Sequence, residues 1–242
     1  AFEAWWTEHG PRIVELANKT DDAASLVALR NDLLASFSQS LDAVGMLDPF
    51  QVRGIVAGFW NQNRYDFLTL MARGSKGVAD AWRTSIVTAL EDKASKDNPL
   101  EHKLVRFLMG DFVTAIAELE AKKAEREAQI KAAGPKEADE EGEGAEAAED
   151  EEEAVSEEQL KAWKKELAAT KKALKTKLET FTEQLGAQVD GLSAEDAGAL
   201  LLKILHDDMR GIVERYIAAQ RKQVVAAFEN WWDKYKVTLT DI

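Results

Sequence analysis

Helical periodicity runs through almost the whole of this chain and leaves few folds open to it. Apolar residues recur at steps of three and four, a spacing that places them on one face of an α-helix, as in Leu26, Leu29, Leu33 and Phe37. Alternation of apolar and polar residues, which is typical of strands, is scarce. The pattern breaks at the four prolines, which favour helix starts and connections: Pro11, Pro49, Pro99 and Pro135. The sequence therefore predicts an all-α fold.

Composition narrows the class of protein. Hydrophobic residues make up 45% of the 242 residues and include seven Trp and nine Phe, enough to fill a core, so global disorder is excluded. The absence of Cys excludes disulfide and thiolate chemistry, and three His without paired spacing disfavour a zinc site. The chain shows neither an apolar run of the ~20 residues that cross a bilayer nor a secretion signal. We expect a cytoplasmic protein with no membrane partner.

An acidic tract dominates the charge of the chain. Thirteen acids and no base lie between Glu137 and Glu158, so this tract accounts for the formal net charge of −13 and the remainder is neutral. That remainder can carry a basic face, which nucleic-acid binding requires. Residues 134–155 cannot bury apolar surface, and we predict that they form a flexible acidic loop.

Two long helical segments flank the tract, at 99–133 and 156–190. Gly134-Pro135 ends the first, and Ser156 with Gln159 three residues later forms a capping box that opens the second. Two helices on either side of one loop favour an antiparallel helical hairpin, with arms of ~45 Å at 1.5 Å per residue.

The remaining residues are predicted to form a helical core. Residues 1–98 supply its N-terminal part, divided by a Gly-rich turn at 72–77, after which a helical stripe resumes. Residues 191–242 are expected to form a long C-terminal helix that packs on the core. Ser193 with Asp196 gives the capping signal at its start.

Two places combine aromatic and basic residues in a manner typical of partner or DNA contacts. Trp60 and Arg64 share one helical face within a stretch that is rich in amides, and these residue types contact bases and phosphates. Packing of Trp60 in the core is the simpler alternative. Near the C-terminus, Trp232 stands beside Lys234 and Lys236, the composition of an interaction hot spot flanked by charges that can also face phosphate.

The environment of Trp232 leaves two interpretations open. A continuous stripe that a core surface can easily cover is formed by Val224, Phe228, Trp231 and Tyr235. Trp232 lies about 100° round the helix from Trp231. It is either exposed for a partner or covered from within by Trp5 and Trp6.

No complete active site is visible in the sequence. Gly74-Ser75-Lys76-Gly77 lacks the upstream Gly and the preceding strand of a phosphate-binding loop. His206-Asp207-Asp208 has no nucleophile placed beside it by any motif, and a solvated helix face is the simpler interpretation. We assign no catalytic, cofactor-binding or metal-binding residue to this chain.

Three strings, in this order, carry a resemblance to a known family: LLASFSQSLDAVGMLDPFQVRGIVAGFWNQNRYDFLTLMARGSKGVADAWRTSIV, DNPLEHKLVRFLMGDF and AAFENWWDKYKVTLTDI. The chain resembles the modification (M) subunit of type I restriction-modification systems, in the region after the catalytic domain. That family consists of S-adenosylmethionine-dependent DNA adenine-N6 methyltransferases. Its Gly-rich cofactor loop and its Asn-Pro-Pro-aromatic motif are absent from this chain, so the resemblance carries over no catalytic residue.

The resemblance implies an assembly role. In that family the subunit works with a DNA-reading specificity subunit and, for cleavage, with a restriction subunit. Its helical C-terminal region contacts the specificity subunit and helps to enclose DNA. The chain is therefore expected to be a fragment of a parent protein that binds S-adenosylmethionine. The alternative is a free-standing helical scaffold or coiled-coil adaptor with no link to DNA.

Overall fold

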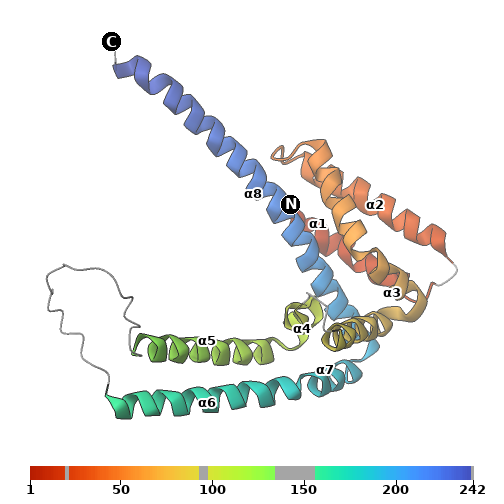
Figure 1. Ribbon diagram of the computed structural model, residues 1–242. Coiled ribbons are helices and arrows are strands. Elements are labelled where there is room, and N and C mark those ends of the chain that lie inside the picture. The colour runs from red at the N-terminus through yellow and green to blue at the C-terminus, as the bar shows by residue number, and fades with distance from the viewer. Residues whose placement is uncertain (20–21, 93–97, 134–155, 241–242) are drawn as a thin grey trace. The chain divides into compact units, whose positions relative to one another are not determined.

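The computed structural model describes residues 1–19, 22–92, 98–133 and 156–240, and the side chains up to residue 236 (Figure 1). Every regular element within these ranges is a helix, so the all-α prediction is confirmed. The elements follow in the order α1 (Phe2–His9), η1 (Gly10–Leu16), α2 (Ala23–Asp42), α3 (Pro49–Glu91), η2 (Pro99–Glu101), α4 (Lys103–Leu108), α5 (Gly110–Ala132), α6 (Glu157–Glu179), α7 (Phe181–Asp190) and α8 (Ala194–Thr240).

The chain divides into two compact units. The first unit contains Ala1–Phe107 and Gln188–Ile242, and the second contains Leu108–Ala187. The division differs from the predicted one, because η2, α4 up to Phe107 and the end of α7 belong to the first unit although they fall within the predicted arms 99–133 and 156–190.

The core of the first unit is built from α3, with α2 and the first half of α8 packed against it. The residues it buries completely are large and apolar, and include Phe37, Phe59, Phe67, Leu33, Ile55, Leu70, Ile86, Leu201 and Ile204. On α3, Gly54 allows a close approach: a Cβ there would lie 2.7 Å from the hydroxyl of Tyr216 on α8. Burial of these side chains is the main stabilising contribution to the unit.

A break at Gly74 divides α3. Its φ of 69° and ψ of −178° lie outside the helical region, and the helix resumes directly afterwards. Only glycine adopts such a conformation without a steric cost. The predicted Gly-rich turn at 72–77 is thus confined to one residue, with helix on both sides.

The second unit contains α5 and α6, which lie side by side in opposite directions (Figure 1). Arg126 near the end of α5 donates to Glu166 on α6 at 2.7 Å, whereas Phe112 near its start lies 5.6 Å from Phe181, centroid to centroid. Each predicted arm is interrupted, at Met109 in the first and at Thr180 in the second. The predicted acidic loop at 134–155 lies outside the described residues.

Candidate functional site

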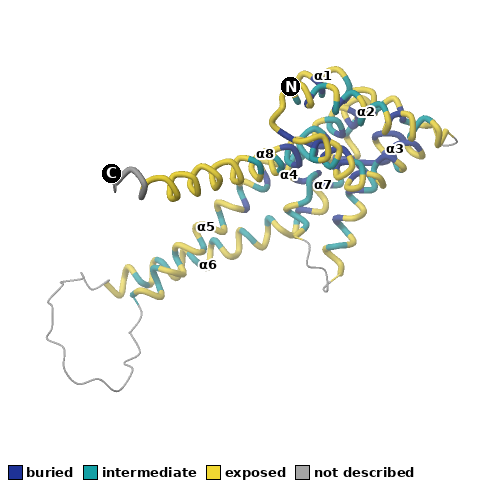
Figure 2. Tube along the Cα trace, turned by 90° about the horizontal axis from the view of Figure 1, so that it is seen from above, coloured by how far each residue is buried: buried dark blue, intermediate teal, exposed yellow. Residues whose placement is uncertain are grey.

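The C-terminal helix extends past the core that its first half covers. Leu201, Ile204, Leu205 and Met209 of α8 are almost completely buried. Further along, Gln220 still contacts Gln51 at the start of α3, with 3.5 Å between the two side-chain amides. From residue 221 to residue 236 every side chain is exposed (Figure 2). This stretch contains neither Gly nor Pro, so the helix continues without support from packing.

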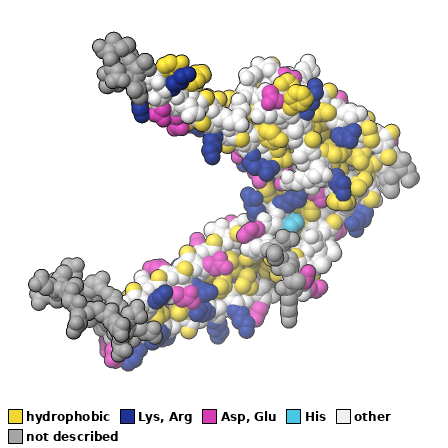
Figure 3. Space-filling view, turned by 45° about the horizontal axis from the view of Figure 1, so that its top comes forward, with side chains coloured by type: hydrophobic (Ala, Val, Ile, Leu, Met, Phe, Trp, Pro, Cys, Tyr) yellow, Lys and Arg dark blue, Asp and Glu magenta, His cyan; other side chains and the backbone are white. Residues whose placement is uncertain are grey.

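Large aromatic side chains gather on this exposed stretch. We define the aromatic end of α8 as Phe228, Trp231, Trp232 and Tyr235, of which Trp232 is 72% exposed. The rings of Phe228 and Trp231 meet edge to face, 5.5 Å apart. Figure 3 shows hydrophobic and basic side chains together along this part of the helix. Apolar groups exposed side by side in this way are common at protein–protein interaction sites.

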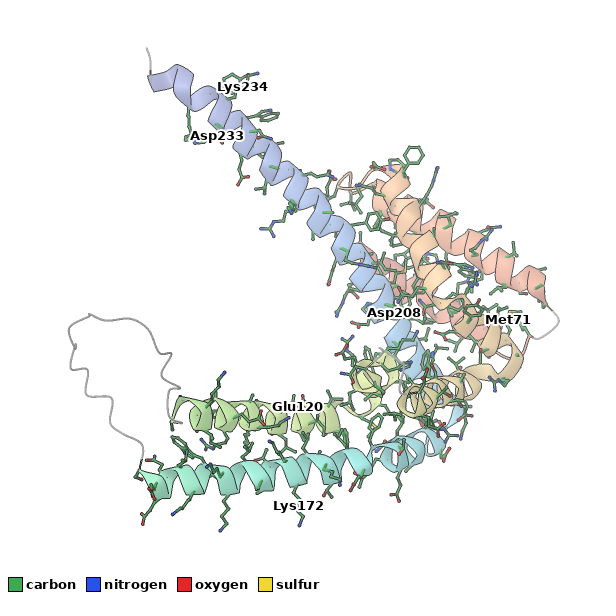
Figure 4. The ribbon with its side chains drawn as sticks, viewed as in Figure 1. Met71, Glu120, Lys172, Asp208, Asp233 and Lys234 are labelled. Carbon is green, nitrogen blue, oxygen red and sulfur yellow. The ribbon has the colours of Figure 1, made fainter. Side chains whose placement is uncertain are left out.

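The two lysines near the aromatic end contact neighbouring side chains on the same helix. The ammonium of Lys234 lies 5.5 Å from the centroid of the Tyr235 ring. Lys236 donates to Asp233 at 2.8 Å. Figure 4 shows Asp233 and Lys234 on different sides of α8. The two lysines predicted as contacts therefore differ, because Lys236 already has a carboxylate partner.

The interpretation that Trp5 and Trp6 cover Trp232 is wrong. Trp5 is 2% exposed, and its indole N–H donates to Ser36 on α2 at 2.9 Å. Trp6 packs edge to face against Phe59 of α3. Both tryptophans are used inside the first unit, so neither is available to α8 at residue 232.

The expectation that a core surface covers the stripe from Val224 to Tyr235 is also wrong. Phe228 is 62% exposed, and Val224, Trp231 and Tyr235 are exposed as well. The physical reason is that the core is too short to reach the stripe. Helix α3 begins at Pro49, and its first turn already contacts Gln220, which precedes the stripe on α8. An apolar stripe predicts burial against some surface, and within the described residues of the first unit no such surface is present.

The other predicted contact pair is separated by the structure. Trp60 is half-buried, and its ring lies 4.7 Å from that of Phe67. Arg64 is exposed and turns to its neighbour Tyr65, with its guanidinium 4.4 Å from the ring centroid and hydrogen-bonded to the hydroxyl. The aromatic partner of Arg64 is therefore Tyr65, and Trp60 packs along α3.

The interpretation of His206-Asp207-Asp208 as a solvated face is wrong for Asp208. Its side chain is 15% exposed and lies 3.3 Å from the ammonium of Lys103, which also contacts Asp66 at 2.7 Å. Burial raises the pKa of Asp208, and the charge of Lys103 opposes that rise. Figure 4 shows Asp208 on the part of α8 that faces the core.

This cluster joins three helices. Lys103 of α4 also donates to Asn63 of α3 at 3.0 Å, and the indole N–H of Trp82 donates to Asp66 at 2.8 Å. The sequence does indicate that Asp208 is buried, since Asp208 lies on the same helical stripe as Leu201, Ile204 and Leu205. A carboxylate on an apolar stripe predicts a buried partner.

Two other features, a cluster of metal ligands and a membrane-spanning helix, are absent from the part of the chain that the structure describes. It contains no group of three or more His, Cys, Asp or Glu side chains able to hold a metal ion. None of its helices is long and apolar enough to span a membrane. No family model matches the chain, and no match was found among curated proteins or solved structures.

Proposed function

We propose that this chain is the non-catalytic helical region that follows the catalytic domain in the M subunit of a type I restriction-modification system. Its role is assembly: the aromatic end of α8 docks a helix of the specificity subunit. The observation that carries this proposal is the exposure of four large aromatic side chains on a helix that continues past its own core. The resemblance stated for the sequence supplies the identity of the partner.

The geometry of the surface fits a helical occupant. Residues 221–236 present apolar side chains at steps of three and four along ~24 Å of helix, at 1.5 Å per residue. Such a row packs into the grooves of a second helix. Trp and Tyr at the centre of such a contact contribute most of its binding energy.

The charges of the same stretch suit a surface close to DNA. Four bases and two acids occur between residues 221 and 236, whereas the complete chain is strongly acidic. Within the assembled complex these bases would add to the enclosure of the duplex. The same proposal makes the restriction subunit a further partner, places S-adenosylmethionine in the catalytic part of the parent protein, and locates the complex in the cytoplasm.

The test compares two aromatic truncations in the full-length M subunit. Trp232→Ala should weaken binding of the specificity subunit by ~2 kcal/mol or more, the usual threshold for a hot spot, without lowering the melting temperature. Phe50→Ala is the matched control, because Phe50 is 81% exposed at the start of α3. It should leave the affinity unchanged.

Titration calorimetry and thermal melts of both variants give the two readouts. Equal affinities for wild type and Trp232→Ala would remove Trp232 from the interface. If none of the aromatic residues at the end of α8 contributes to binding, the free-standing scaffold replaces the proposed assembly role.

A further inference from the structure

Lysine side chains gather on one side of α6 in the second unit. We define the lysine flank of α6 as Lys161, Lys164, Lys165, Lys171, Lys172 and Lys175, all of which are exposed. At 3.6 residues per turn, these six positions fall within about one third of the helix circumference. The flank belongs to the second unit and the aromatic end of α8 to the first, so nothing said of assembly depends on it.

The flank is distinct from the face by which α6 packs on α5. That face is an apolar stripe of half-buried side chains that includes Leu160, Trp163, Leu167 and Leu174. Figure 4 shows Lys172 pointing away from α5. The lysines therefore stay open to solvent while the two helices pack against each other.

Three of the six ammonium groups have no carboxylate partner among the residues that the structure describes, namely those of Lys164, Lys165 and Lys172. The other three lie near exposed carboxylates: Lys161 near Glu157 at 3.9 Å, Lys171 near Glu127 at 2.9 Å and Lys175 near Glu179 at 3.8 Å. Ion pairs of exposed groups are weak, so a stronger anionic partner can replace them.

No acid interrupts the flank. The one acid between Lys161 and Lys175 is Glu166, which lies about 100° round the helix from Lys165. Its carboxylate accepts from Arg126 of α5 at 2.7 Å. The flank is therefore a row of positive charge, with its carboxylate partners at its edges.

The length of the row fits a repeating anion. From Lys161 to Lys175 the flank extends over ~21 Å, at 1.5 Å per residue. Phosphates of one strand of a DNA duplex recur every ~3.4 Å along its axis, so the flank can follow about six of them. Lysine contacts phosphates as a point charge and releases the counterions bound to them.

The side chains that the flank lacks narrow the choice of anion. The flank contains no aromatic residue on which the bases of a single strand would stack. It contains no Arg, Asn or Gln to read base edges. Between its lysines lies only Ala168, so no large apolar side chain is present to enter a lipid surface. We propose that the lysine flank of α6 binds the phosphate backbone of duplex DNA without regard to base sequence.

The experiment measures the binding of labelled duplexes of about 20 base pairs to the full chain, without any partner subunit, by fluorescence anisotropy. Two duplexes of unrelated sequence should bind equally, because the flank reads no bases. A preference between them, or no binding of either, would overturn the proposal. Tighter binding of a single strand of the same length, or of phosphatidylserine vesicles at the same phosphate concentration, would overturn the choice of duplex DNA.

Replacing the three unpaired lysines locates the binding. Lys164→Gln, Lys165→Gln and Lys172→Gln together should weaken duplex binding about tenfold or more at ~50 mM salt. The slope of log affinity against log salt concentration should become shallower by ~2.7, at 0.9 for each phosphate contact. Gln forms helices well, so the helicity measured by circular dichroism should not change. An unchanged slope would overturn the proposal.

A charge-preserving variant separates charge from structure. Lys164→Arg, Lys165→Arg and Lys172→Arg together keep three positive charges and should bind the duplex at least as tightly as the wild type. A loss of affinity in this variant would overturn the role given to charge.

A second triple variant removes the same number of charges from α8. Arg221→Gln, Lys222→Gln and Lys234→Gln together should leave duplex binding by the chain alone unchanged. A loss equal to that of the α6 variant would assign the DNA to α8 and overturn the proposal. The docking of the specificity subunit is tested separately by Trp232→Ala, so failure of either idea is distinguishable from failure of the other.

Discussion

The ammonium of Lys103 lies 3.3 Å from the carboxylate of Asp208, and this ion pair joins α4 to the middle of α8. The same ammonium contacts Asp66 of α3 at 2.7 Å. One lysine thus compensates two carboxylates, each of which is less than one-fifth exposed. It ties the helix that later carries the aromatic end to the core of the first unit.

Removing that ammonium should destabilise the first unit. Lys103→Met leaves two poorly solvated carboxylates without a counter-charge, and the expected cost is about 3 kcal/mol of unfolding free energy. Lys161→Met breaks an ion pair with Glu157 that is largely exposed, and should cost no more than ~0.5 kcal/mol. Urea unfolding of both variants measures the difference. Equal losses of unfolding free energy in the two variants would contradict the idea that burial makes the Lys103 ion pairs more important for stability.

His102 should make stability depend on pH. Burial, followed by the charge of Lys103, lowers the pKa of His102 from its ordinary value of 6.5. The unfolded chain therefore takes up a proton at a higher pH than the folded chain. Stability is complete above pH 6.5 and is lost as the pH falls through the window below it.

A substitution at His102 checks this dependence. The Nδ1 of His102 accepts from the backbone N–H of Leu104 at 3.1 Å, a bond that protonation removes. His102→Asn keeps a capping oxygen but cannot titrate, so its stability should change less between pH 7 and pH 5 than that of the wild type. Unfolding free energies at both pH values are the measurement. Parallel pH profiles would rule out His102 as the source.

Substitution by alanine should have opposite effects on stability at two glycines. Gly74→Ala places a side chain at a φ of 69°, beside Asn18, and should cost ~1 to 2 kcal/mol. A Cβ at Gly211 in α8 would meet nothing within 4 Å, so Gly211→Ala should stabilise by up to ~1 kcal/mol through helix propensity. Roughly 1 kcal/mol moves the melting temperature by ~2 to 4 °C in a chain of this size. A gain at Gly74 would refute the strained break.

Local features were predictable because their causes lie close together in the sequence. Ser156 accepts from the backbone of Gln159 at 3.2 Å, and Ser193 from that of Asp196 at 3.0 Å, as the capping patterns predict. Each cap needs only residues within one turn. The break at Gly74 falls inside the predicted turn for the same reason.

Tertiary features were not predictable in the same way. Lys103 and Asp208 are separated by 105 residues, and no local pattern pairs them. The stripe of Phe228 and Trp231 has the spacing of a buried face, but burial also requires a core long enough to reach it. The length of the core along α8 depends on how α3 packs on α8. The spacing of apolar residues in the sequence does not indicate that packing.

Hydrogen exchange of α8 tests the proposed docking most directly. The backbone amides of residues 221–236 belong to a helix that no part of the described core covers, so they should exchange quickly in the free M subunit. Binding of the specificity subunit should slow their exchange by roughly tenfold or more, since each ~1.4 kcal/mol of protection corresponds to a factor of ten. Helix α6 of the second unit serves as the reference, and its exchange should be unchanged. Unchanged exchange at residues 221–236 in a complex shown to be assembled would contradict the proposed docking surface.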